Sequence, residues 1–419
     1  MEHIKKTLYQ YIIKSAVILL VMGILGTLLL TLVWCIPENF LRAHVDGAWE
    51  IFRAENSDHG DIQFFTYTYS SKLIADTDMM RAVIANNPGS ALVNAMNING
   101  YSRYWHGYLV LLRPLIAIFT YGQLRYLLAA AFLLQGIYLA AEFREKFGMC
   151  IAMAFAVSIA GVNIMAVPYS FHVSICMLFA FAAAIIVLKK YDPSKENIKI
   201  WSFFLITGGI TSYIDFLTTP VLTLALPLLI LIMVNLSYGE NDLKRNFLTC
   251  FRNSFAWCIG YAFFWAEKWL IGSLILQRNV LADALLRANK WETTGDGVGT
   301  ESFGRLYALA KNITTLIPIG DTNIGEALPF LLIFLVAVIV LILNFIKNIK
   351  NVKNGWRSAL PLLFVSLYPY FWIIAIQNHS TVHATFWVFR IQLAAIFGLL
   401  CTYFYLTGKF NSIEKKGSY

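Results

Sequence analysis

The chain is short of charge. Only 14% of its 419 residues are Asp, Glu, Lys or Arg, against about 25% in soluble globular domains. Hydrophobic residues make up 58% of the chain, and its mean hydropathy is +0.63. This composition excludes an ordinary soluble globule, which surrounds its apolar core with charged surface. We expect the solvent for most of the chain to be lipid.

Cysteine is also scarce, and no two cysteines show a paired spacing in a polar loop. All six lie in or at the ends of apolar runs: Cys35, Cys150, Cys176, Cys250, Cys258 and Cys401. We therefore predict no disulfide framework and no zinc site. The sequence also lacks a Walker-type loop, a dinucleotide fingerprint and a correctly placed Ser/His/Asp signature. Because every loop expected in the cytoplasm is too short to fold around a nucleotide, ATP and nucleotide-linked substrates are disfavoured.

Basic residues outnumber acidic ones, which gives a net charge of +9. They lie in short loops between apolar runs rather than on one folded face. This distribution is typical of the signals that orient membrane helices, so we expect no nucleic-acid partner.

Apolar runs bounded by charge predict ten membrane-spanning helices. Each run approaches the length of about 20 residues that crosses a hydrocarbon core of about 30 Å. The predicted spans are 15–34, 124–141, 149–167, 171–188, 200–218, 220–236, 249–269, 328–345, 358–376 and 391–408. The first run has no small-residue cleavage site after it, so we expect it to remain as a span. The predicted fold is an all-α polytopic membrane protein forming a single domain over residues 1–419.

Lysine gathers on one side of these spans. With both termini in the cytoplasm, the lysine-rich loops also face inward, as the positive-inside rule requires. The run 108–120 is apolar but short and carries Arg113 and Pro114 in its middle. We predict an interfacial or re-entrant helix there, because a further span would turn the lysine-rich loop 347–357 outward. Two large loops, 36–124 and 277–327, then lie outside.

Six of the seven histidines map to the outer side, so we expect any chemistry to lie there. His379, His383 and Arg390 would share one narrow face of a continuous helix. Such a face suits a phosphate, because arginine offers a planar fork and histidine a switchable donor. The alternative is an interfacial anchor of polar side chains between two spans, and spacing does not separate the two.

Other basic candidates lie in or near the outer loops. Arg103, His106 and Arg113 precede or enter the short apolar run. An arginine in an apolar run is costly unless it is paired or reaches water, which makes Arg113 a functional candidate; the alternative is a side chain that snorkels to the interface. Lys268 lies between two tryptophans, as in an aromatic belt, and a surface anchor is the favoured interpretation.

Carboxylates are candidate general bases. Asp46, Asp76 and Asp78 lie in the first large loop, where most acidic residues are simply solvated. Asp215 is more unusual, because a carboxylate at the end of a span and close to Pro220 needs a partner.

Four segments together resemble the GT-C superfamily of integral-membrane glycosyltransferases, in particular bacterial members that modify surface polysaccharides such as O-antigen. These segments are 101–108, 112–115, 215–218 and 378–390. The long acidic first loop and the many spans add to the resemblance, which covers most of the chain.

The resemblance implies an undecaprenyl-phosphate-linked sugar as donor and a glycan of the cell envelope as acceptor, at the outer face of the bacterial inner membrane. An acidic residue soon after the first span would be the base, which favours Asp46, with Asp76 and Asp78 as rivals. The chain departs from many relatives in lacking a clear acidic pair there. No cofactor is expected, although some members use a divalent metal. The candidate substrate-binding residues are Arg103, His106, Arg113, Asp215, Lys268, His379, His383 and Arg390.

The runner-up is a flippase or other transporter of a lipid-linked sugar. A transporter predicts charged or broken helices near the membrane midplane and two related halves. The sequence instead concentrates its polar groups at the outer ends of the spans. A structural assembly subunit, a third interpretation, would not explain the histidines and arginine at 379–390.

Overall fold

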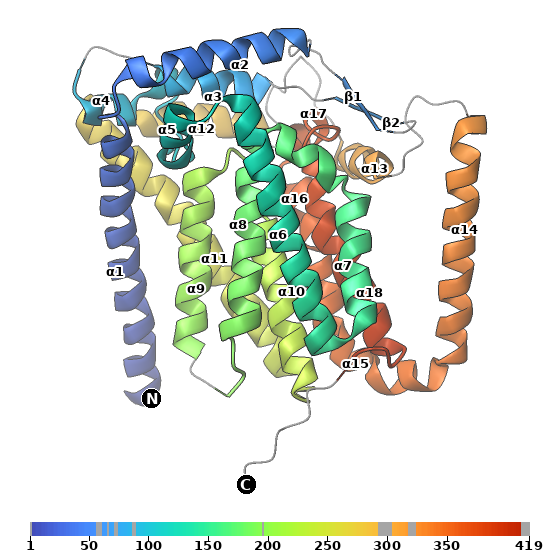
Figure 1. Cartoon of the computed structure of the whole chain (residues 1–419). Helices are drawn as coiled ribbons and strands as arrows, with labels where there is room; N and C mark the ends of the chain where they lie inside the picture. Colours follow the sequence, from blue (N-terminus) through green and yellow to red (C-terminus); the bar gives the residue numbers. More distant parts are fainter. Residues whose placement is uncertain are drawn as a thin grey trace.

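The computed structural model describes residues 2–55, 61–64, 67–70, 74–85, 89–194, 197–291, 304–316 and 324–411. Long helices run roughly side by side, and shorter helices cover one end of them (Figure 1). We call this the capped end. α1 begins and α18 ends at the opposite end of the bundle.

Each of the ten predicted spans contains helix. The long elements are α1 (Glu2–Val33), α6 (Tyr121–Phe147), α7 (Met149–Gly161), α8 (Phe171–Lys190), α9 (Asn197–Ile214), α10 (Leu222–Ser237), α11 (Leu243–Leu276), α14 (Ile324–Lys347), α15 (Ile349–Ser366) followed by α16 (Tyr368–Ala375), and α18 (Gln392–Leu406). Among the described residues, six segments are long and apolar enough to cross a membrane: Tyr9–Val33, Tyr121–Phe147, Phe171–Lys190, Leu243–Leu276, Ile349–Ala375 and Val388–Leu406. The chain is thus a multi-pass membrane protein, and the count of ten stays a prediction because α7, α9, α10 and the apolar part of α14 are shorter.

The capped end is built from the two large loops and from short connections between long helices. Its elements are η1 (Glu38–Phe40), α2 (Arg42–Ala54), β1 (Asp61–Phe64), β2 (Tyr67–Ser70), α3 (Ile74–Val83), α4 (Ala91–Met96), η2 (Ile98–Gly100), α5 (Leu109–Ile118), η3 (Ile164–Tyr169), α12 (Val280–Trp291), α13 (Arg305–Thr315), α17 (Gln377–Val382) and η4 (Val388–Ile391). The strands pair antiparallel, with Asp61 opposite Ser70. The short run at 108–120 forms α5, which lies among the helices of the cap rather than along the bundle (Figure 1).

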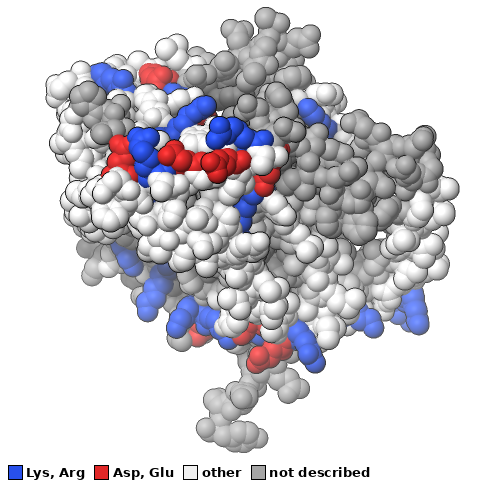
Figure 2. Space-filling model, turned by 45° about the horizontal axis from the view of Figure 1, so that its top comes forward, with Lys and Arg blue, Asp and Glu red and all other residues white. Residues whose placement is uncertain are grey.

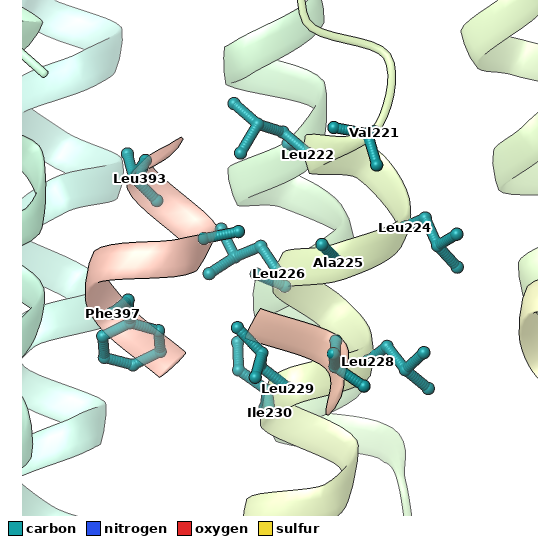
Figure 3. Packing of buried hydrophobic residues seen from close by; sticks show 14 of the residues in the cluster. Val221, Leu222, Leu224, Ala225, Leu226, Leu228, Leu229, Ile230, Leu393 and Phe397 are labelled. Atoms are coloured by element: carbon teal, nitrogen blue, oxygen red, sulfur yellow. The ribbon is translucent and has the colours of Figure 1, made fainter. Parts of the chain in front are cut away.

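The core of the bundle is organised around α10. Every residue of this helix is buried, and nearly all of them are apolar. A helix that is apolar all round is stable only when other helices or lipid surround it. Leu222 and Leu226 point to the side on which Leu393 and Phe397 of α18 lie, whereas Leu224 and Leu228 point away from it (Figure 3). This packing fixes the positions of the helices whose ends carry the candidate site.

Small residues let α9 and α11 approach closely. A Cβ atom at Gly208 would collide with the carbonyl of Trp257, and one at Gly260 with the carbonyl of Leu205. The backbones are therefore in direct contact, as glycines permit in membrane helix pairs. This contact fixes the positions of the α9 end and of the α11 side chains that lie below the cap.

Exposed charge on one face of the molecule gathers near the two ends of the bundle (Figure 2). On the face shown in Figure 2, charged side chains form two bands with uncharged surface between them. The band at the capped end has both signs, whereas the opposite band is mostly Lys and Arg. An uncharged belt between charged ends is the surface that a bilayer requires.

Candidate functional site

A carboxylate from the first large loop lies at the start of α8. Asp76, in the first turn of α3, is only 1% exposed. Its Oδ2 accepts a hydrogen bond from the Ser170 hydroxyl, and its Oδ1 accepts one from the backbone N–H of His172 at 3.2 Å. Ser170 is itself the N-cap of α8. A negative charge is favoured there, because the first N–H groups of a helix lack partners within it and carry partial positive charge.

Burial makes Asp76 a stronger base than a solvated aspartate. Loss of water raises the pKa of its carboxyl above the ordinary value, while the bonds from Ser170 and His172 oppose that shift. Arg125 lies nearby but engages Glu55, with N–O distances of 2.6 and 2.9 Å. A carboxyl with a raised pKa accepts a proton more readily near neutral pH, as a general base must.

Three histidines lie together beside the start of α8. The ring of His172 contacts that of Trp387, with centroids 5.0 Å apart. His383 stacks on the same indole at 4.3 Å, and His379 lies 4.6 Å from His383. Burial lowers the pKa of His379, and positive charge on His383 or His172 would lower it further. An anion bound beside these rings would favour their protonated form, so we call His172, His379 and His383 the histidine cluster.

The segment between α16 and α18 is not one helix. α17 ends at Val382 and η4 begins at Val388, so the predicted continuous face over residues 379, 383 and 390 was wrong. The run 381–389 is rich in β-branched and aromatic residues, which disfavour helix. His379 and His383 nevertheless remain neighbours. Arg390 is 5% exposed on η4, with its guanidinium 4.6 Å from the ring centre of Phe389.

Helix α13, from the second large loop, contacts the segment between α16 and α18. The amide of Asn312 donates to the carbonyl of Ser380 at 2.9 Å, and the amide of Gln392 donates to the carbonyl of Asn312 at 2.7 Å. All three residues are buried, where such bonds are costly to break. Both large loops therefore contribute to the region around the histidine cluster.

Phe216 connects this cluster to the tyrosine-rich segment at 101–108. Its ring centre lies 5.7 Å from that of His172 and 4.8 Å from that of His106. Tyr104 and Tyr108 contact the same phenyl ring at 5.0 and 5.2 Å. The structure thus brings three of the segments that carry the family resemblance, 101–108, 215–218 and 378–390, into one region.

His106 fixes the conformation of its own loop. Its Nε2–H donates to the carbonyl of Tyr101 at 2.9 Å, and its Nδ1 accepts from the hydroxyl of Tyr108 at 3.1 Å. Its backbone has φ +54°, a left-handed conformation unusual outside glycine. Burial, with smaller contributions from the charges of Lys268 and Arg103, lowers the pKa of His106 to about 3. The ring is therefore neutral, and its described bonds hold the loop.

Most of the hydrogen bonds to Asp215 come from its own turn, and the thiol of Cys176 on α8 donates to it as well. The backbone N–H of Thr218 donates to both carboxylate oxygens, at 3.2 and 3.0 Å, and the Thr218 hydroxyl donates as well. Leu217 in this turn has φ +62°, which the hydrogen-bonded turn has to stabilise. The carboxylate also lies close enough to Tyr261 of α11 to act on it electrostatically. Asp215 thus shapes the turn that carries Phe216.

Arg103 joins the two large loops. Its guanidinium pairs with Asp283 of α12 at 3.1 Å and lies over the rings of Tyr101 and Tyr104, at 4.4 and 5.3 Å. The side chain of Arg103 is 11% exposed and that of Asp283 is 46% exposed.

Lys268 is buried under the first large loop rather than anchored at the surface. It is 0% exposed, and its ammonium donates to the carbonyl of Met96 at 3.1 Å. Met96 is the last residue of α4, and a cation is favoured at a helix C-terminus. The ammonium also lies 5.6 Å from the ring centre of Trp105. Lys268 therefore ties α11 to the cap.

Arg113 binds three backbone carbonyls. Its guanidinium donates to Val33 O at 2.8 Å, to Ile36 O at 3.0 Å and to Val83 O. Val33 is the last residue of α1, Ile36 follows that helix, and Val83 is the last residue of α3. The Arg113 side chain therefore binds carbonyls that have no hydrogen-bond partner within their helices. The ring of Trp34 lies 4.1 Å from the guanidinium, and a cavity of about 150 Å³ adjoins it. Burial lowers the pKa of Arg113 to about 10, so it stays charged.

The other two candidate bases lie on the surface. Asp46 is exposed on α2, whose opposite face buries Val45, Ala48 and Phe52. The side chain of Asp78 is 60% exposed and pairs with Arg81 at 3.1 Å. Of the three aspartates, Asp76 is the one that the fold brings to the start of α8.

Sequence reasoning did not single out His172, Phe216 or Trp387 as site residues, although Phe216 lies in the segment 215–218 that carries part of the resemblance. One local signal could have pointed to His172: Ser170, two residues earlier, is a residue type that commonly caps the start of a helix. Among the residues that the structure describes, no three His, Cys, Asp or Glu side chains are arranged as metal ligands. Comparison of the chain with protein-family models, with curated proteins and with solved structures gives no match.

Proposed function

We propose that the chain is a GT-C-type glycosyltransferase of a bacterial inner membrane. It moves a sugar from undecaprenyl phosphate to a surface polysaccharide or lipid-linked glycan at the outer face, with both termini in the cytoplasm. The convergence of Asp76 with the histidine cluster at the start of α8 carries this proposal. Asp76 accepts from the N–H of His172, whose ring contacts Trp387, on which His383 stacks. Glycosyl transfer needs a base and a phosphate site close together.

The chemistry assigns a role to each group. The oxygen of an acceptor hydroxyl attacks the anomeric carbon, and the bond from that carbon to the phosphate oxygen breaks. Asp76 accepts the hydroxyl proton, and the lipid phosphate leaves with the bonding electron pair. Arg390, His379 and His383 stabilise the charge on the leaving phosphate. A positioned general base typically contributes about 10²–10⁴-fold to the rate.

Four other basic candidates take a supporting role in this proposal. The described contacts of Arg103, His106, Arg113 and Lys268 are with protein groups that hold the first large loop over the bundle. That loop carries Asp76. These residues would thus act on transfer through the position of the base.

The experiment compares two aspartates that lie two residues apart. Purified protein in lipid nanodiscs is given an acceptor glycan and a panel of undecaprenyl-phosphate-linked sugars, and released undecaprenyl phosphate is measured. We expect Asp76→Asn to lower turnover at least ~100-fold, in line with loss of a general base. Asp78→Asn is the matched control, because this exposed side chain lies outside the site, and it should stay within about threefold of wild type.

Two results would overturn the proposal. One is full turnover by a folded Asp76→Asn variant. The other is passage of the intact lipid-linked sugar across liposome membranes with no bond cleavage, which would identify a transporter.

A further inference from the structure

A continuous set of rings extends from the histidine cluster into the bundle. We call it the aromatic cluster, made of Trp387, His172, Phe216, Tyr104, Trp265, Tyr261 and Trp372. Its members come from α8, α11, α16, the segment 101–108, the turn after α9 and the segment before η4. Beyond Phe216, Tyr104 contacts Trp265 at 5.9 Å, and Tyr261 contacts Trp265 and Trp372 at 5.4 and 6.4 Å.

Five polar atoms of this cluster have no hydrogen-bond partner within the described part of the chain. They are His172 Nδ1, Tyr261 Oη and the Nε1 atoms of Trp265, Trp372 and Trp387. His172, Tyr261 and Trp387 are 3%, 9% and 8% exposed. A buried polar group without a partner costs about 1–3 kcal/mol, and folded proteins rarely leave several together. Their concentration in one set of rings points to a ligand that brings several oxygens.

We propose that the aromatic cluster binds the sugar of the lipid-linked donor and that this sugar is a neutral hexopyranose. A pyranose ring has apolar C–H faces that pack on aromatic rings, and hydroxyls around its edge that accept from indole N–H groups. Sites for small ligands likewise combine apolar walls with a few placed polar groups. The inference rests on the proposed function and places the sugar beside the histidine cluster, which would bind the phosphate.

The charges near the aromatic cluster favour a neutral sugar over a uronic acid. The buried Asp215 carboxylate, which directly precedes Phe216 of the cluster and accepts from Thr218, would repel a second carboxylate placed beside these rings. Arg103, which lies over the Tyr104 ring, is already paired with Asp283. Indole N–H groups also suit neutral hydroxyl oxygens, because they donate without adding charge.

The first experiment measures binding of methyl glycosides to the full-length protein in detergent by tryptophan fluorescence. The panel is methyl glucoside, galactoside, mannoside and N-acetylglucosaminide, with methyl glucuronide as the acidic comparison. We expect at least one neutral glycoside to quench saturably and to bind at least ~10-fold more tightly than the glucuronide. Equal or tighter binding of the glucuronide, or no saturable binding by any neutral glycoside, would overturn the inference.

Two conservative variants locate the binding site. Tyr261→Phe and Trp265→Phe keep a ring but remove the unpartnered O–H or N–H, and each should weaken binding of the selected glycoside about fivefold or more. Trp356→Phe is the control, because this tryptophan is 47% exposed on α15, away from the cluster. Equal affinity in all three variants would contradict the assignment, provided that their thermal unfolding matches wild type.

A separate arm tests the proposed function. Citronellyl phosphate without a sugar probes the phosphate site, and it should bind wild type and Tyr261→Phe equally. If a glycoside binds at the aromatic cluster but citronellyl phosphate does not bind, the glycosyltransferase proposal fails and the sugar site stands. If citronellyl phosphate binds and no neutral glycoside does, the sugar site fails and the phosphate site stands.

Discussion

The backbone N–H of His172 donates to the Asp76 carboxylate at 3.2 Å, across a sequence separation of 96 residues. This bond ties the first large loop to the helix that carries the first member of the histidine cluster. Because the Ser170 hydroxyl donates to the same carboxylate, the loop cannot move away without exposing two donors at the start of α8.

Removing the Asp76 carboxylate should destabilise the protein. Asp76→Ala leaves the Ser170 hydroxyl and the His172 N–H without their acceptor, and we expect it to lower the free energy of unfolding by about 1–3 kcal/mol. Thermal unfolding in detergent would measure the change. Asp46→Ala, at an exposed position on α2, should stay within about 0.5 kcal/mol of wild type. Equal losses in both variants would contradict the anchoring role.

Arg390→Ala should abolish transfer while leaving membrane insertion intact. Loss of a cation that stabilises a leaving group costs about 10²–10³ in turnover. Arg390→Lys should recover part of the rate, because an ammonium keeps the charge but loses the planar fork. Released undecaprenyl phosphate reports the rate, and the amount of protein in the membrane fraction reports insertion. A folded Arg390→Ala variant with wild-type turnover would remove Arg390 from the site.

Arg113→Lys should weaken the cap. One ammonium cannot reproduce the fork that reaches the carbonyls of Val33, Ile36 and Val83, so buried acceptors lose their donors. We expect a loss of about 2–3 kcal/mol in the free energy of unfolding and faster cleavage of the first large loop by added protease. Arg42→Lys, at an exposed pair with Glu38, is the control and should change neither. Unchanged stability in Arg113→Lys would assign the residue to substrate instead.

His106 should make the folded protein sensitive to acid. Burial lowers its pKa to about 3, whereas an unfolded histidine titrates near 6.5. Between these values the unfolded chain binds a proton that the folded chain does not, so stability falls as the pH falls from about 6.5 towards 3. At pH 4.5 this group alone contributes about 3 kcal/mol of destabilisation. His106→Gln should reduce the fall in melting temperature between pH 7 and pH 4.5, and an unchanged fall would disprove the assignment.

The long helices were predictable from the sequence, because lipid imposes a length and an apolar composition on each helix that spans it. The short run around Arg113 forms the short helix α5 among the cap elements, and its interfacial or re-entrant position in a membrane stays a prediction. The end of the fifth predicted span was less accurate. Helix α9 ends at Ile214 rather than near residue 218, because the Asp215 carboxylate binds the N–H groups of its own turn.

The candidate site was less predictable, because its residues meet only through tertiary contacts. The sequence did not show which of three aspartates in the first large loop is buried. The fold buries Asp76 and leaves Asp46 and Asp78 on the surface. Arg113 is similar, because its carbonyl partners lie at least 30 residues away in the chain. Contacts between residues so far apart in the chain cannot be read from the local sequence.

Helix α10 presents no polar stripe and has no residue outside the core. A helix that is apolar on every side is stable both among lipid acyl chains and among the helices that surround it in the folded protein. It can therefore enter the bilayer beside α8, which precedes it in the chain, and pack against α18 only after that helix is made, so insertion and assembly are separable steps for this protein. A chain truncated after residue 240 should therefore still integrate into the membrane.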